Sequence, residues 1–159
     1  MRSLTWRQLG LIGTFTAASM LALLAGCSGG GGGEASPSPT PVCSPIAPML
    51  SVLQAQIFTP SCSVGGSSCH SGLAPTQGFN TSTPATLLMT STNVTAVETF
   101  NSMPVIRIVP GNHASSYVWM KVAGTVGIEP VRMPQTAQYL NSCQIDAIAA
   151  WIDAGAQNN

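Results

Sequence analysis

Charged residues are the scarcest feature of this sequence. Only 6% of its 159 residues are Asp, Glu, Lys or Arg, and five acidic residues balance five basic ones. No basic cluster is present, so we do not expect a nucleic acid as a partner. Carboxylates are few and no set of nucleophile, base and orienting residue is apparent, so we do not expect an enzyme.

The sequence also lacks an apolar run long enough for an ordinary membrane-spanning helix. Its most apolar stretch, residues 9–24, is interrupted by two glycines and a threonine, whereas a spanning helix needs about 20 predominantly apolar residues. Two arginines precede this stretch and small residues follow it. Residues 1–26 therefore have the organisation of an export signal.

The export signal ends in Leu24-Ala25-Gly26-Cys27, which resembles the lipobox of bacterial lipoproteins. The resemblance implies that Cys27 is acylated and that the protein is exported and lipid-anchored to a membrane, facing the periplasm or the cell surface. Ser28 favours the outer membrane. Residues 27–42 are rich in Gly, Ser and Pro, with no apolar surface to offset chain entropy, so we expect a disordered tether.

The remaining residues, 43–159, are enough for one modest domain. Without residues 1–26, three Lys and Arg residues stand against five Asp and Glu, a net charge of −2. Four cysteines remain in this part: Cys43, Cys62, Cys69 and Cys143. An even number suits an oxidising compartment, and three disulfide pairings are possible.

Apolar residues at helical spacing predict a helix near each end of the domain. The first begins at Pro45 or Pro48 and ends at Pro60, and the last is capped by Asn141 or Ser142 and ends before Gly155. Between them we expect short helices over residues 84–89 and 115–122, an extended segment over 104–109, and loops over 61–75 and 90–102.

The adjacent pair Cys69-His70 has the chemistry of a haem attachment site. A thiol can bond to a haem vinyl group, and the neighbouring imidazole can bind the iron. The usual motif is Cys-x-x-Cys-His, whereas Cys62 gives the spacing Cys-x6-Cys-His here. The intervening residues include two glycines and three serines, so the longer loop can bulge while both thiols reach the porphyrin edge.

Five segments in the same order resemble the mono-haem cytochrome c domains of bacterial lipoproteins, over roughly residues 54–156. They are Ile57-Phe58-Thr59-Pro60-Ser61-Cys62, Cys69-His70-Ser71-Gly72, Gly78-Phe79-Asn80, Arg107-Ile108-Val109-Pro110-Gly111 with Ser116-Tyr117 and Lys121, and Arg132-Met133-Pro134 with the terminal helix. The resemblance implies a small all-α fold in which the first and last helices cross around one haem c.

The same resemblance implies roles for individual residues. His70 and Met133 would be the axial ligands of the iron, although Met103 is also followed by proline and competes with Met133. Arg132 is the favoured partner of a haem propionate, ahead of Arg107 and Lys121, and all three could instead be surface charges. A disulfide between Cys43 and Cys143 would fit the crossing helices.

The function predicted is electron transfer with redox proteins of the cell envelope. The alternative is a haem-free lipoprotein with a structural or interaction role, in which Cys62 and Cys69 form a disulfide and His70 is a surface residue. A zinc site is disfavoured because adjacent Cys and His residues strain tetrahedral geometry.

Overall fold

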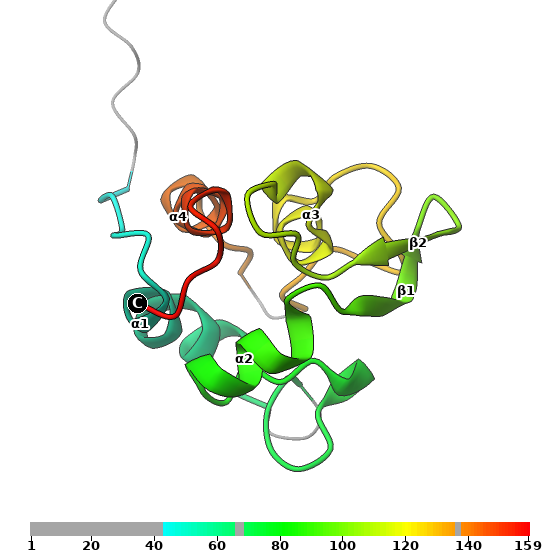
Figure 1. Cartoon of the computed structure of the whole chain (residues 1–159), viewed down its shortest axis with the longest axis horizontal. Coiled ribbons are helices and arrows are strands. Elements are labelled where there is room, and N and C mark those ends of the chain that lie inside the picture. The colour runs from blue at the N-terminus through cyan, green and yellow to red at the C-terminus, as the bar shows by residue number, and fades with distance from the viewer. Residues whose placement is uncertain (1–42, 66–68, 136–137) are drawn as a thin grey trace, which may run out of the picture. The chain divides into compact units, whose positions relative to one another are not determined.

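The structure is a computed structural model that describes residues 43–65, 69–135 and 138–159 (Figure 1). The predicted signal peptide, the linker over residues 27–42 and Cys27 lie outside the described residues. In the described part of the chain, no helix has the length and apolar character needed to cross a membrane.

Helices and one small sheet make up the described residues. In chain order the elements are α1 (Leu50–Leu53), the π-helix η1 (Gln54–Cys62), the 3-10 helix η3 (Thr76–Gly78), α2 (Pro84–Ser91), β1 (Thr95–Phe100), β2 (Met103–Ile106), the 3-10 helix η4 (His113–Ser115), α3 (Tyr117–Ala123) and α4 (Ser142–Asp153). The prediction of an all-α fold is therefore wrong, because β1 and β2 form an antiparallel sheet.

The turn between the two strands explains this correction. Phe100 pairs with Met103, so only Asn101 and Ser102 connect the strands, and both have positive φ, at 51° and 61°. A two-residue turn of this kind matches the twist of a β-hairpin, and Asn is one of the residues that tolerate it. The predicted loop over residues 90–102 consequently contains β1, and the predicted extended segment falls partly on β2.

The first helix also differs from its prediction. It begins at Leu50 and continues past Pro60 as a π-helix that ends at Cys62. Its first backbone N–H groups are satisfied from the far end of the sequence, because Leu50 N donates to Asn159 Oδ1 at 2.8 Å and Ser51 N donates to Asn159 O at 2.9 Å. The wide turns of a π-helix carry the chain through the proline to the first cysteine of the site.

The other three α-helices agree well with the sequence. α2 begins with Pro84 at its first position and has Thr83 as its N-cap. α3 ends at Gly124, which has a φ of 78°, and α4 begins with a capping box between Asn141 and Gln144. Each start or stop rests on a local signal in the sequence, which is why it was predictable.

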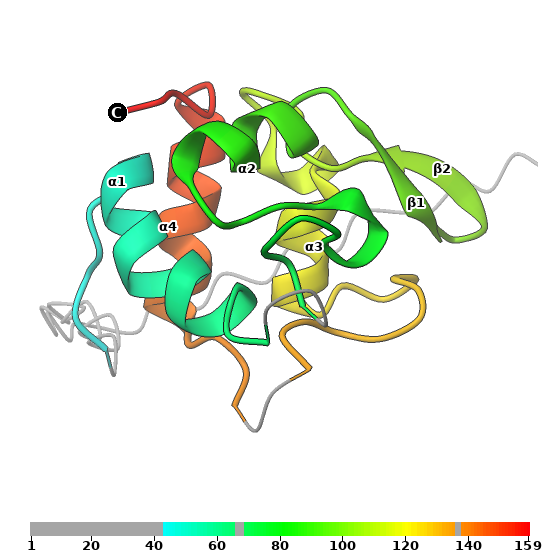
Figure 2. The ribbon, with the colours of Figure 1, turned by 90° about the horizontal axis from the view of Figure 1, so that it is seen from below.

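The hydrophobic core lies where α1 and α3 pack against α4 (Figure 2). Among the largest side chains with no exposed surface, Ile148 and Trp151 come from α4, and Leu50 and Leu53 come from the first helix. The rings of Phe58 and Trp151 meet edge to face at 6.4 Å. These contacts fix the first helix, and with it Cys62, against the last.

A disulfide joins Cys43, which precedes α1, to Cys143 in the first turn of α4. This is the pairing that the family resemblance implied. It ties the start of the first helix to the start of the last, across a sequence separation of 100 residues.

Candidate functional site

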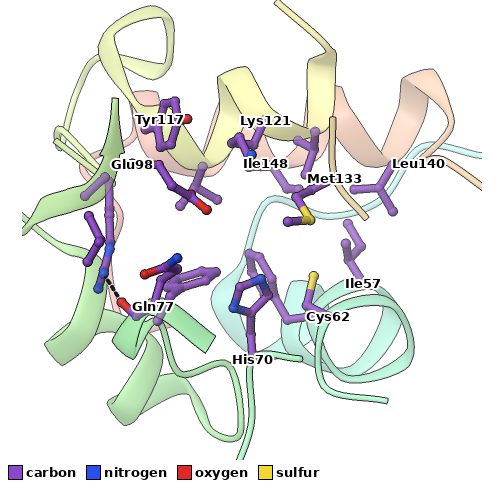
Figure 3. Close-up of a pocket in the computed structure, with 17 residues that line it drawn as sticks. Ile57, Cys62, His70, Gln77, Glu98, Tyr117, Lys121, Met133, Leu140 and Ile148 are labelled. Carbon is purple, nitrogen blue, oxygen red and sulfur yellow. Dashed lines mark hydrogen bonds between the residues drawn. The ribbon is translucent and has the colours of Figure 1, made fainter. Parts of the chain in front are cut away.

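A cavity that is partly open to solvent lies between the helical core and the hairpin (Figure 3). Most of its lining is apolar, and the first and last helices, the hairpin, α3 and the loops all contribute. The lining includes the polar, charged and sulfur-bearing side chains of Cys62, His70, Gln77, Glu98, Arg107, Tyr117, Lys121 and Met133, together with the ring of Phe79.

His70 enters the cavity from the loop after the π-helix. Its Nδ1 lies 3.3 Å from the carbonyl oxygen of Thr76, and the edge-to-face contact with Phe79 has a centroid distance of 5.1 Å. With Nδ1–H donating to that carbonyl, Nε2 keeps its lone pair. Burial lowers the pKa of His70 and outweighs the opposing effect of its backbone hydrogen bonds. The neutral imidazole, which is the form that binds metals, is therefore favoured.

Met133 reaches the cavity from the opposite side. Figure 3 shows its sulfur pointing into the cavity, toward His70 and Cys62. Its backbone N–H donates to the carbonyl of Lys121 at 2.9 Å, which fixes the loop against α3. Met103, the competing ligand, lies on β2 with 66% of its surface exposed and does not line the cavity. The structure thus brings His70 together with Met133 and leaves Met103 outside.

The two cysteines of the attachment motif are free, half-buried thiols. Cys62 lies at the junction of the main cavity and a second hollow, which Cys69 also lines. His70 and Met133 border both spaces. Burial, aided by the nearby Cys69, raises the pKa of Cys62 to about 12, so this thiol stays protonated at neutral pH.

Two buried cations line the cavity, and both were less favoured candidates than Arg132. Arg107 donates to the carbonyls of Thr90 at 2.6 Å, Gly78 at 3.3 Å and Gln77. Lys121 donates through Nζ to the carbonyl of Glu129 at 2.9 Å. Burial lowers the pKa of both groups, and the negative charge of Glu98 opposes that effect.

Arg132, the favoured propionate partner, does not line the cavity. Its Nε donates to the carbonyl of Val122 at 2.9 Å, and its guanidinium stacks on the ring of Tyr139 at 4.4 Å. These contacts hold the side chain along α3. The position of Arg132 next to Met133 in the sequence therefore did not predict where its side chain lies.

The sequence reasoning missed Glu98 and did not assign Tyr117 to the site. Glu98 projects from β1 into the cavity (Figure 3). The hydroxyl of Tyr117 donates to the carbonyl of Glu129 at 2.6 Å and lies 2.9 Å from the carbonyl of Thr99. A signal for Glu98 existed, because β-branched and aromatic residues are frequent over residues 94–100 and favour a strand.

The donor set of this cavity suits a haem better than a bare metal ion. Within the described ranges, no three His, Cys, Asp or Glu side chains converge as a metal site. A haem iron has four equatorial ligands from the porphyrin, so the protein supplies only the axial ligands. One imidazole and one thioether on opposite sides, two free thiols beside them and apolar walls meet that requirement.

No protein-family model, curated protein or solved structure matches this chain. Its function has to be inferred from the chemistry of the cavity and of the sequence.

Proposed function

We propose that this protein is a c-type cytochrome with one covalently attached haem, which transfers electrons between redox proteins of the cell envelope. The observation that carries this proposal is the placement of His70 and Met133 on opposite sides of one apolar cavity. The position of Cys62 between this cavity and the hollow lined by Cys69 adds to it.

In this proposal His70 and Met133 would hold the iron, and Cys62 and Cys69 would bond covalently to the haem. The haem supplies reversible one-electron exchange when bound. The soft sulfur of Met133 favours the reduced iron and so raises the reduction potential. The hydrogen bond from His70 to Thr76 holds the ring in one orientation.

The walls of the cavity have complementary roles. The apolar side chains exclude water from the cofactor, which favours electron exchange without ligand exchange. Arg107 and Lys121 provide buried positive charge for the haem propionates, and they take the role first assigned to Arg132. Glu98 introduces one opposing negative charge.

We also propose that the protein is exported and held at a membrane through Cys27, with the outer membrane favoured. The export signal over residues 1–26 and the tether over residues 27–42 support this from the sequence. The disulfide between Cys43 and Cys143 supports it independently, because such bonds persist in oxidising compartments outside the cytoplasm.

The test is expression with and without cytochrome c maturation machinery, followed by intact mass and absorption spectra. We expect the mass of one haem to be added and a sharp α-band to appear on reduction. A double variant with Cys62→Ser and Cys69→Ser is the matched control and should carry no covalent haem. A colourless wild-type protein in which Cys62 and Cys69 have oxidised to each other would instead support the haem-free lipoprotein.

A further inference from the structure

The base of the loop that carries the two cysteines is closed by hydrogen bonds. His70 N donates to the carbonyl of Cys62 at 3.0 Å, and Ser71 Oγ donates to the carbonyl of Ser63 at 2.9 Å. The two ends of the loop are therefore held next to each other by groups at its base. This closure does not depend on the length of the loop.

Thr81 secures the His70 end of that base. It is fully buried, with 0% exposed surface, and both its N–H and its Oγ1–H donate to the carbonyl oxygen of His70, at 2.6 and 2.8 Å. Burying a hydroxyl is unfavourable unless it forms hydrogen bonds. Here the hydroxyl is used to hold the backbone of the proposed iron ligand.

Two further side chains fix Thr81 itself. Ser63 Oγ lies 2.8 Å from Thr81 Oγ1 and 3.0 Å from the carbonyl of Thr81. Gln54 is buried in the π-helix, and its Nε2 donates to the same carbonyl at 2.8 Å and to Thr59 Oγ1 at 3.0 Å. A continuous set of hydrogen bonds thus runs from the helical core through Thr81 to His70.

We propose that Thr81 is a positioning residue for His70, and that Gln54, Ser63 and Thr81 together form a polar clamp on the base of the cysteine loop. The role of His70 as iron ligand rests on the proposed function, whereas the clamp itself rests on these contacts alone. The clamp explains how a Cys-x6-Cys spacing can serve attachment. It holds Cys62 and His70 at a fixed separation, whatever the number of residues between the two cysteines.

The clamp can be tested with Thr81→Val, which keeps the shape and removes the hydroxyl, and with Thr81→Ser, which keeps the hydroxyl. Ser91→Ala is a matched control, because Ser91 is equally buried and donates to the carbonyl of Leu87 at 2.6 Å, within α2. Two measurements are made on the full chain: hydrogen exchange of the His70 amide without haem, and the midpoint potential and Met–Fe(III) charge-transfer band with haem.

We expect Thr81→Val to speed exchange of the His70 amide by about tenfold beyond its effect on global stability, as for the loss of one hydrogen bond. It should also shift the potential and weaken the charge-transfer band, and Thr81→Ser should restore all three. Ser91→Ala should alter stability only.

A Thr81→Val protein that behaves like Ser91→Ala in these measurements would overturn the clamp, as would an unprotected His70 amide in the wild-type chain. Failure of the proposed function looks different. A wild-type protein that attaches no haem rejects the cytochrome, while exchange of the His70 amide still decides whether the clamp exists.

Discussion

Two methionines of this chain are each followed by proline, and their surroundings differ. Met133 is half-buried and packs against the core beside the cavity, whereas Met103 is exposed on β2. The sequence alone could only favour one by its distance from the last helix. The two methionines differ in the burial and in the direction of their side chains, and both properties depend on the tertiary fold.

Met133→Ala should lower the midpoint potential of the haem-loaded protein and open the iron to added ligands such as imidazole. The reason is that loss of the thioether removes the ligand that favours reduced iron. Potentiometry and ligand titration followed by absorption measure both effects. Met103→Ala is the control and should change neither; a potential that responds to Met103 instead would reassign the ligand.

Cys62 should alkylate slowly in the haem-free chain. The thiolate is the nucleophile, and burial raises the pKa of this thiol from 9.0 to about 12. At pH 8 we expect iodoacetamide to modify Cys62 about tenfold or more slowly in the native protein than in denaturant. Mass mapping of time points reads the rate, and equal rates in the two states would contradict the burial of Cys62.

The raised pKa of Cys62 also makes the haem-free protein sensitive to alkali. A neutral thiol is favoured in the folded state, so its contribution is complete below pH 9 and is lost as the pH rises toward 12. Cys62→Ser should therefore reduce the loss of stability between pH 9 and 12, measured by denaturant unfolding.

Motif chemistry led to the proposed ligands His70 and Met133, whereas it favoured Arg132 over Arg107 and Lys121 and missed Glu98. Cys69-His70 and Met133-Pro134 could be recognised because each residue type has a specific role toward iron. Arg107, Lys121 and Glu98 have many possible roles, and their place depends on where α3 and the hairpin pack. Such residues can be assigned only after the fold is known.

Among the helices, α1 depends most on distant residues. Its N-cap residue, Met49, provides no side-chain hydrogen bond, and Asn159 supplies the missing acceptors. The prediction that this helix begins at Pro45 or Pro48 was therefore wrong, because its start at Leu50 depends on a partner outside the local sequence. A sequence pattern indicates local caps but not a partner 109 residues away.

Asn159→Ala should destabilise the protein by about 1 kcal/mol, because it removes the side-chain acceptor of Leu50 N. The carbonyl of residue 159 remains for Ser51 N. Guanidinium unfolding measures the loss. Asn158→Ala, on the exposed neighbouring residue, is the control and should have little effect; equal losses would show that the cap is not used.

The 3-10 helix η4 is attached to α4 through hydrogen bonds between His113 and Asp153. Asp153 accepts from His113 N at 2.9 Å and from His113 Nδ1 at 2.7 Å, and these hydrogen bonds hold the pKa of the carboxyl below its usual 3.8. A depressed pKa stabilises the fold above pH 3.8, and this contribution is lost as the pH falls below it. Asp153→Asn should therefore lower thermal stability at pH 7 but not near pH 2.

Asp146→Asn provides the matched control for that experiment, because Asp146 is an exposed carboxylate on the same helix. A thermal shift equal to that of Asp153→Asn across the whole pH range would show that helix charge, rather than the pair with His113, causes the effect.

At the scale of the whole molecule, the site is assembled from segments far apart in the sequence. The cavity takes Ile57 from the first helix, Glu98 from the hairpin, Tyr117 from α3 and Ile148 from α4. Their arrangement depends on packing rather than on local signals, so the sequence could predict a loop that carries Cys69 and His70 but not the walls around it.

The disulfide between Cys43 and Cys143 holds the two ends of this assembly together. A bond closing a loop of 100 residues strongly restricts the unfolded chain, and removing such a bond from a small domain costs about 2–5 kcal/mol. The double variant Cys43→Ser, Cys143→Ser should lose about this much stability in guanidinium. Both helices that the bond joins line the cavity, through Ile57 and Ile148, so haem retention should fall before the protein unfolds. Unchanged stability under reducing and oxidising conditions alike would mean that the core contacts of α1 and α4 suffice without the bond.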